Sequence, residues 1–390
     1  MRVIKKRQLT GTTSATPREY EAAHAYVDRE AAAEGIVLLE NKDRLLPLTK
    51  GSKLAVFGAG AAKTIKGGTG SGDVNERYAV TIAQGLENAG FRITTKQWLA
   101  DFEQEYQKSR LEWKKRILKE SEACKAAGAA YGFFSAYAGN QYSMPVGRKA
   151  YASDADTAIY AVARVAGESA DRHASEGDYY LSKEEHQLLA DVCAMYANVI
   201  VIVNAGGVMD LSFMDEFENI KALLVISQPG MEGGNAVADI LCGKESPSGK
   251  LTDSWAYRYG DYPNAKSFSH NNGNVQKEVY GEGLYVGYRY FDSFGVPVRY
   301  GFGFGRSYTS FSTETEQVTV DGKTVTVRVA VKKHRKPGGK RSGAGICSFA
   351  RWAAGKGSKA AGGLCQDPKA GSRSGRKAEP AFFGGGSGKL

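Results

Sequence analysis

Short apolar runs alternate with amphipathic segments through the first two thirds of the chain. A bounded apolar run of four to eight residues is typical of a strand buried on both faces. Such runs predict strands at residues 53–58, 91–95, 157–164, 199–204 and 222–227. Helical spacing follows at residues 78–88, 182–196 and 235–242. Alternation of this kind predicts an α/β fold, a doubly wound and mostly parallel sheet with helices on both faces.

Two further segments have helical character. Residues 17–34 begin with Pro17, are rich in Glu and Ala, and run into Gly35, which predicts a helix. Residues 99–125 carry Glu, Lys, Leu and Trp at helical spacing, and residues 126–150 are rich in Gly, Ala and Tyr. We interpret residues 99–150 as an inserted helical arm followed by a loop.

The pattern changes to strict alternation from residue 317. Val, Thr and charged residues alternate on either side of Asp321 and Gly322, which predicts a β-hairpin and the start of a second, all-β domain. After residue 331 no Val, Thr or Tyr occurs and 14 of 59 residues are Gly. Strands need β-branched and aromatic residues, so the all-β domain does not continue.

These changes divide the chain into four predicted parts. The parts are a helical lead-in (1–30), the α/β domain (31–312), a truncated start of a β-sandwich (313–331) and a basic low-complexity tail (332–390). The abrupt change of composition in the tail resembles translation in a shifted reading frame, and the alternative is a disordered appendage.

The net charge of +10 is concentrated in the tail. Residues 332–390 hold 14 Lys and Arg but only 2 Asp and Glu. The folded body is therefore not basic, and we expect no nucleic-acid partner.

The five cysteines are scattered and form no Cys-x-x-Cys or Cys/His cluster, so we expect neither disulfides nor a metal site. The sequence shows no secretory leader and no apolar run long enough for a membrane span. We expect a cytoplasmic protein without a membrane partner.

Two glycine-rich segments follow the first predicted strand. GAGAAK at residues 58–63 has Lys63 where a dinucleotide fingerprint has glycine, and GGTGSGD at residues 67–73 lacks the ending of a P-loop and the first glycine of a nucleophile elbow. The second segment is either a tight turn that needs positive φ or a ligand-binding loop at the carboxyl end of a strand.

The hexapeptide GESADR follows the predicted strand at 157–164. One interpretation is a surface loop with a local pair between Asp171 and Arg172. The other is a loop that projects Glu168 as an acid/base, with its shape fixed by Asp171 and Arg172. A glutamic acid serves as a general acid near neutral pH only if burial or a neighbouring carboxylate raises its pKa.

Taken together and in this order, these segments resemble family 3 glycoside hydrolases over residues 31–313. An ordered series of motifs is far more specific than any one of them. The matching stretches are AEGIVLLEN (33–41), GTGSGDVN (68–75), GESADR (167–172), GDYYLS (177–182), NAGG (204–207), GMEGGNA (230–236), PSGKL (247–251), YGEGLYVGYRY (280–290) and YGFGFG (300–305).

The resemblance implies a fold and a division of the catalytic site. The α/β domain would be the family's (α/β)6 sandwich, which is flavodoxin-like, and the hairpin would begin a fibronectin III-like domain. In this family a (β/α)8 barrel carries the nucleophilic aspartate. No barrel precedes residue 31, so the chain is similar to the subgroup whose sandwich domain comes first, and it needs a barrel to complete the site. As an isolated chain we expect it to be inactive.

The resemblance also assigns residues and a substrate class. The family's acid/base glutamate falls on Glu168, and the reaction is a retaining hydrolysis of β-glucosides, oligosaccharides or related β-glycosides, without metal or cofactor. The residues expected to bind the sugar are Gly70, Ser71, Asp73, Asp171 and Arg172.

Two other functions stay open at this point. The first is a non-catalytic module of the same fold that binds carbohydrate or another protein. The second is a nucleotide-binding flavodoxin-like protein, suggested by the glycines at residues 58 and 60.

Overall fold

The computed structural model describes residues 16–69, 76–129, 132, 136, 142–165, 172–268, 276–277, 279–321, 324–334 and 376–378. Its strands are β1 (Val37–Asn41), β2 (Lys53–Phe57), β3 (Arg92–Ile93), β4 (Thr157–Arg164), β5 (Asn198–Ala205), β6 (Ile220–Val225), β7 (Trp255–Ala256), β8 (Val298–Tyr300), β9 (Ser310–Asp321), β10 (Thr324–His334) and β11 (Arg376–Ala378). Its helices are α1 (Glu19–Gly35), α2 (Ala59–Ala62), α3 (Ile82–Asn88), α4 (Lys96–Ala126), α6 (Lys183–Met195), α7 (Phe213–Glu216), α8 (Gly233–Leu241) and α10 (Tyr288–Phe294), with 3-10 helices η1 (Lys42–Arg44) and η3 (Tyr259–Asp261).

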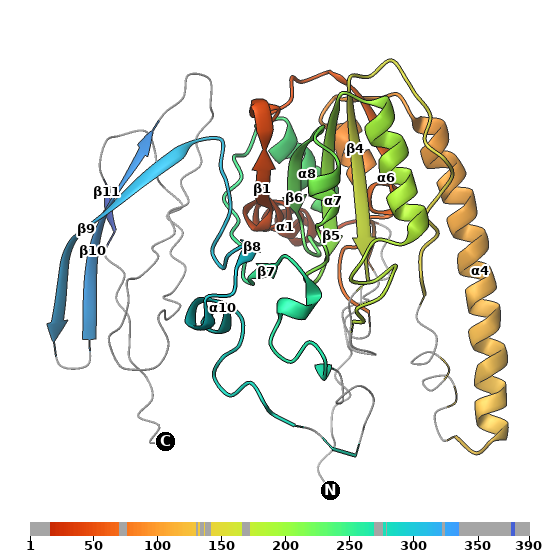
Figure 1. The fold of residues 1–390 in the computed structure, drawn as a ribbon. Coiled ribbons are helices and arrows are strands. Elements are labelled where there is room, and N and C mark those ends of the chain that lie inside the picture. The colour runs from red at the N-terminus through yellow and green to blue at the C-terminus, as the bar shows by residue number, and fades with distance from the viewer. Residues whose placement is uncertain are drawn as a thin grey trace, which may run out of the picture.

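The main sheet has six strands in the order β1-β6-β5-β4-β2-β3 (Figure 1). All neighbouring strands are parallel except β1, which runs antiparallel to β6 at one edge. The predicted strand at 157–164 is β4, and each of its eight residues is buried. The predicted mostly parallel α/β sheet is therefore confirmed.

Side chains along β4 alternate between two hydrophobic clusters, one on each face of the sheet. Tyr160 and Val162 pack with residues of α4, α6 and α7, whereas Ile159 and Ala161 pack with residues of α1, α3 and α8. Because strand side chains point alternately to opposite faces, a strand buried on both faces reads as a continuous apolar run. Figure 1 shows the helices on both sides of the sheet.

Helices α3 and α8 touch through glycine. A Cβ atom on Gly85 would lie 1.9 Å from the carbonyl oxygen of Gly234, and one on Gly234 would lie 2.0 Å from the carbonyl oxygen of Thr81. Thr81 also ends the irregular stretch before α3, because its hydroxyl accepts from Gln84 N (3.2 Å) while its N–H donates to the Gln84 side chain (2.9 Å). This capping box explains why the helix begins at Ile82, inside the predicted segment.

Helix α4 continues far beyond the sheet (Figure 1). It begins three residues before the predicted arm, and its first turns belong to the core, because Trp98 and Phe102 are 2% and 1% exposed. Their rings stack at 5.6 Å, and Phe102 stacks on Tyr106 at 6.4 Å. The aromatic spacing of four residues thus anchors the projecting helix to the body.

Strands β9 and β10 form the predicted hairpin, with Asp321 opposite Thr324. The residues between them lie outside the described part of the chain. Within the tail, β11 pairs with β10, with Ala378 opposite Val329. The hairpin stands to one side of the main sheet, and Val320 on it is 69% exposed.

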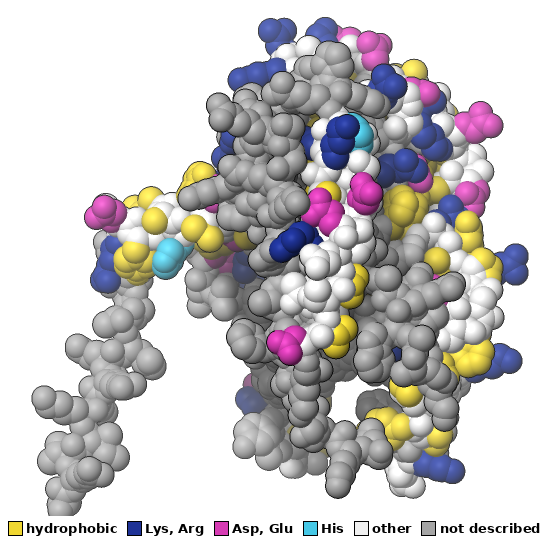
Figure 2. All heavy atoms as spheres, turned by 90° about the vertical axis from the view of Figure 1, so that its left-hand side faces the viewer, with side chains coloured by type: hydrophobic (Ala, Val, Ile, Leu, Met, Phe, Trp, Pro, Cys, Tyr) yellow, Lys and Arg dark blue, Asp and Glu magenta, His cyan; other side chains and the backbone are white. Residues whose placement is uncertain are grey.

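Basic and acidic side chains are interspersed over the face drawn in Figure 2. In the described part of the chain, none of the helices combines the length and apolar character that a membrane span requires.

Candidate active site

Four loops leave the main sheet at the carboxyl ends of its parallel strands. They follow β2, β4, β5 and β6, and their described residues are 58–69 and 76–81 (which include the short helix α2), 165 and 172–182, 206–212, and 226–232. Parallel strands place these ends at one edge of the sheet, where open α/β folds bind ligands. In Figure 1 the arrow of β4 points to this edge.

Five of the six predicted site residues lie outside the described residues, and Arg172 lies inside. The five are Glu168, Gly70, Ser71, Asp73 and Asp171. Their two segments follow β2 and β4, which are neighbours in the sheet, with Phe57 opposite Tyr160. The structure therefore brings the origins of both predicted loops to adjacent positions at the carboxyl edge.

The Arg172 side chain donates three hydrogen bonds to other residues of the chain. Its Nε donates to Asp178 Oδ1 (2.6 Å), Nη2 donates to the Asp178 carbonyl oxygen (3.0 Å), and Nη1 donates to the Val208 carbonyl oxygen (2.7 Å). The second carboxylate oxygen of Asp178 accepts from His173 N at 2.5 Å. The ion partner of Arg172 is thus Asp178, and a third loop, the one after β5, is tied to the same guanidinium.

Arg164 ends β4 immediately before the GESADR loop and is almost completely buried. Its guanidinium binds Glu185 through two bonds of 2.6 and 2.7 Å, and the two side chains are 6% and 11% exposed. Its Nε donates to the Asp178 carbonyl oxygen (2.7 Å) and its Nη2 to that of Tyr180 (3.2 Å). Glu185 is held in turn by the N-cap of α6, because Ser182 N donates to it at 2.8 Å. A buried charge pair with its remaining hydrogen bonds satisfied is rigid.

Asn204 joins the loops after β2 and β6 from its place in β5. It is completely buried near the end of β5, where its Oδ1 accepts from Ile65 N (2.6 Å) and its Nδ2 donates to the carbonyl oxygens of Ile65 (3.0 Å) and Ser227 (2.7 Å). Gly230 N donates to the Lys66 carbonyl oxygen at 2.9 Å. The glycine-rich segment after β2 therefore starts from backbone fixed by both β5 and β6.

Tyrosines lie beside the loop after β4. Tyr179 is 4% exposed, its ring lies 4.9 Å from Tyr180 and 5.2 Å from Tyr259, and its carbonyl oxygen accepts from Asp210 N. Burial raises the pKa of Tyr179 far above its ordinary value, and burial followed by the Asp210 charge raises that of Tyr180. Both phenols stay neutral at physiological pH.

The glycines of the segment at residues 58–63 are explained by close packing against β4. A Cβ on Gly58, which has φ +93°, would lie 2.4 Å from the Ala161 carbonyl oxygen, and a Cβ on Gly60 would lie 3.1 Å from the same atom. Because neither residue has a Cβ atom, the backbone at these two positions can pack directly against the backbone of β4.

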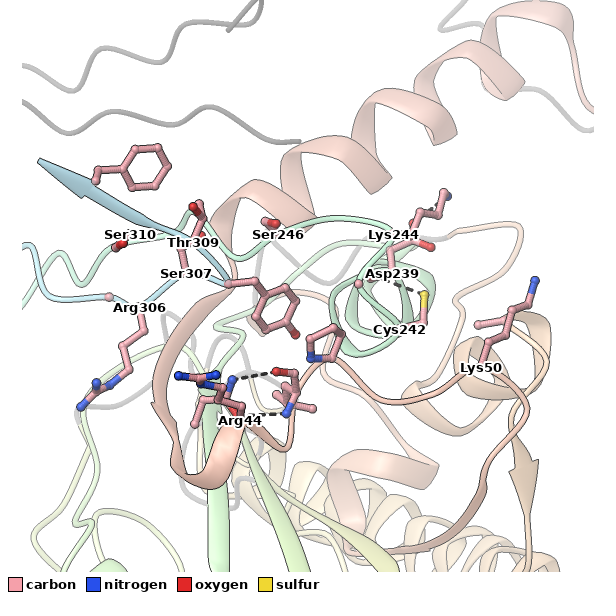
Figure 3. Close-up of a pocket in the computed structure, with 18 of the residues that line it drawn as sticks. Arg44, Lys50, Asp239, Cys242, Lys244, Ser246, Arg306, Ser307, Thr309 and Ser310 are labelled. Atoms are coloured by element: carbon pink, nitrogen blue, oxygen red, sulfur yellow. Dashed lines mark hydrogen bonds and ion pairs between the residues drawn. The ribbon is translucent and has the colours of Figure 1, made fainter. Parts of the chain in front are cut away.

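A cavity of about 1510 Å³ lies at the opposite, amino edge of the sheet (Figure 3). Several cations line it, but Arg29 and Lys244 bind Asp239, and Arg306 donates to the Leu39 carbonyl oxygen. In Figure 3 the side chain of Arg306 points away from those of Lys50 and Lys244. Among the described residues, no group of three or more His, Cys, Asp or Glu could hold a metal ion.

Residues 36–288 match the family model of the glycosyl hydrolase family 3 C-terminal domain. The chain belongs to glycoside hydrolase family 3. It is 36% identical over 323 residues to β-glucosidase A of Butyrivibrio fibrisolvens and 35% identical over 309 residues to a β-glucosidase of Ruminococcus albus. These alignments cover 75% and 77% of the chain but only 36% and 30% of the two relatives.

A solved β-glucosidase structure shows the same fold. β-Glucosidase 3B of Thermotoga neapolitana, solved in complex with α-D-glucose, is 34% identical with a TM-score of 0.64, over 80% of this chain and 42% of that protein. The family 3 sandwich domain predicted from the motifs is confirmed.

Sequence reasoning missed the residues that hold the family 3 loops in place. Asp178 and Asn204 lay within motifs that carry the resemblance, but no role followed from their spacing. Arg164 gave a usable signal, because a charged residue at the end of a fully apolar strand needs a buried partner.

Proposed function

We propose that this chain supplies the acid/base of a β-glucosidase reaction, with Glu168 as that group, and that the nucleophile comes from a segment outside these 390 residues. The observation that carries the proposal is the adjacency of β2 and β4, because the two loops with the family 3 sugar-site and acid/base motifs leave these neighbouring strands at one edge. The β-glucosidase relatives, of which the chain spans about a third, support the substrate class.

The proposed reaction retains the configuration of the sugar. One carboxylate attacks the anomeric carbon, and Glu168 protonates the departing glycosidic oxygen. Glu168 then takes a proton from the water that releases the sugar. The two carboxylates of a retaining enzyme lie about 5–5.5 Å apart, so the partner domain has to close over the carboxyl edge. No metal or cofactor takes part in this scheme.

We assign sugar binding to the two segments at this edge. Gly70, Ser71 and Asp73 would meet the sugar from the loop after β2, and Asp171 and Arg172 from the loop after β4. A guanidinium carries five N–H donors. Three hydrogen bonds fix Arg172 to Asp178 and Val208, which leaves donors for a sugar hydroxyl.

An assay of this chain on an aryl β-glucoside tests the division of labour. We expect no turnover above the buffer rate, because the proposed nucleophile is supplied elsewhere. Turnover that disappears in Glu168→Gln would contradict that division. Calorimetric sugar binding that is indifferent to Glu168→Gln would favour the non-catalytic carbohydrate-binding module instead.

A further inference from the structure

One motif of the family series has no part in the proposed reaction. It is YGEGLYVGYRY at residues 280–290, which runs into α10. Between residues 279 and 302 six large apolar side chains are exposed, and we call them the apolar patch. They are Val279, Tyr280, Leu284, Val286, Phe294 and Phe302. Tyr280 is 91% exposed and Phe294 is 60% exposed. Apolar side chains gathered on a surface in this way indicate an interaction site.

Ring contacts hold the apolar patch to the body of the domain. The Phe294 ring lies 5.0 Å from that of Tyr285 and 5.2 Å from that of Tyr290, measured between centroids. Tyr290 lies 5.4 Å from Phe291, which is buried. The exposed ring is therefore already ordered by its neighbours, which lowers the entropy cost of binding a partner.

Further ring contacts connect the patch to the carboxyl edge of the main sheet. Phe291 lies 5.7 Å from Tyr262, which lies 6.3 Å from Tyr259. Tyr259 in turn lies 5.2 Å from Tyr179, in the loop after β4. Figure 1 shows α10 beside β7 and β8, toward the end of the sheet at which β4 stops. A continuous row of rings thus runs from the apolar patch to the edge that carries the proposed site.

We propose that the apolar patch is the docking surface for the domain that supplies the nucleophile. This inference rests on the proposed function, which places the nucleophile outside these 390 residues and requires its domain to close over the carboxyl edge. A domain in that position lies next to the patch, because the row of rings ends beside the loop after β4.

The composition of the patch and the length of the relatives support this occupant. Aromatic residues are enriched and charged residues depleted at the centre of protein interfaces, and the patch holds three aromatic residues and no charged one. The chain spans only 36% and 30% of its two β-glucosidase relatives, so these proteins contain ample further sequence for such a domain.

A second copy of this chain is the competing occupant. It would also cover apolar side chains, but it would bring no nucleophile to the carboxyl edge. It would also stand where the domain with the nucleophile has to close. The chemistry of the proposed site therefore favours the nucleophile domain over self-association.

The docking surface is tested by hydroxyl-radical labelling of side chains in two proteins, this chain alone and a chimera in which it replaces the matching part of Butyrivibrio fibrisolvens β-glucosidase A. We expect Tyr280, Phe294 and Phe302 to be labelled about fivefold more slowly in the chimera, because the centre of an interface is packed as densely as a protein interior. Tyr26 is the matched control, since it is 63% exposed and lies one turn of α1 from Arg29 at the amino edge. Its labelling should be the same in both proteins. A chimera with the Ruminococcus albus β-glucosidase carries the test if the first does not fold.

A pair of substitutions shows whether the patch itself makes the contact. In the chimera, we expect Phe294→Asn to return the labelling of Tyr280 and Phe302 toward the rates of the isolated chain. Tyr26→Asn should leave both residues protected. In the isolated chain both variants should unfold close to the wild-type temperature, because substitutions at exposed positions have small effects on stability.

Equal labelling of the patch in the isolated chain and in the chimera would overturn the proposal. So would a patch that is already protected in the isolated chain while sedimentation shows a dimer, because a second copy would then be its occupant. Labelling needs no turnover, so this inference and the proposed function fail separately. A chimera protected at the patch in which Glu168→Gln changes no rate contradicts the acid/base assignment alone. An active chimera with an unprotected patch contradicts the docking surface alone.

Discussion

The two edges of the main sheet differ in how their charged groups are used. At the amino edge a cavity of about 1510 Å³ is lined by cations that are bound locally or point apart (Figure 3). At the carboxyl edge, Arg172 and Asn204 each tie separate loops together, and Arg164 ties the loop after β4 to α6. The comparison teaches that side chains that join several segments of the chain indicate where geometry has to be held.

The sharpest test of this difference replaces one arginine at each edge. Arg164→Met leaves Glu185 buried without its partner, and breaking a buried pair costs about 3–5 kcal/mol. Arg29→Met at the amino edge should cost less, about 1–3 kcal/mol, because Lys244 still binds Asp239. Urea unfolding of both variants gives the two free energies. Equal losses would contradict the claim that the buried arginine at the carboxyl edge contributes more to the stability of the fold than the one at the amino edge.

Two asparagines make the same kind of contact at the two edges. The Asn204 side chain binds the N–H and C=O of Ile65. The Asn41 side chain binds the N–H and C=O of Leu46, each at 2.9 Å. We expect Asn204→Ala to cost about 2–3 kcal/mol, because it leaves buried backbone groups unsatisfied, and Asn41→Ala about 1 kcal/mol.

Amide hydrogen exchange measures how far each asparagine substitution loosens the backbone near it. Asn204→Ala should accelerate exchange around Ile65, next to the glycine-rich segment, while Asn41→Ala should leave that region unchanged. If Asn41→Ala loosens the residues around Ile65 to the same degree, the two edges are not independent.

The smallest expected effect concerns an exposed ion pair. The hydrogen bond from Arg299 lowers the pKa of Asp215, so the pair stabilises the fold above the ordinary carboxyl pKa and loses its effect as the pH falls through the lowered value. Asp215 is 68% exposed, and solvent screening limits Asp215→Asn to under about 1 kcal/mol at pH 7. Urea unfolding at pH 7 and at pH 3 should show a smaller difference from wild type at the lower pH. A constant difference would point to packing rather than charge.

The sequence predicted the strands well where burial alone decides them. β4 was predicted with both of its ends, because a strand buried on both faces has a nearly continuous apolar sequence, here bounded by Thr157 and Arg164. The segment at 91–95 was predicted as a strand, but β3 pairs only at Arg92 and Ile93. Instead, the hydroxyl of Thr95 accepts from Val56 N (2.7 Å) and donates to its carbonyl oxygen (2.9 Å), a contact that propensity does not reveal.

The site was predicted less completely, for a physical reason. The motifs located the loops and the ordered series gave the family, but the partner of Arg172 is Asp178, six residues further on. That pairing depends on the turn at Gly177, which has φ +78°, and on the return of the chain past Val208. Hydrogen bonds formed by such tertiary returns leave no periodic pattern in the sequence.

The most direct test of the central claim is a chimera in which this chain replaces the matching part of Butyrivibrio fibrisolvens β-glucosidase A. We expect the chimera to hydrolyse aryl β-glucosides, and Glu168→Gln to lower its kcat by about 10²–10⁴ for poor leaving groups, because these need a general acid. The loss should be much smaller for a leaving group that needs no proton. An active chimera in which Glu168→Gln leaves both rates unchanged would contradict the account.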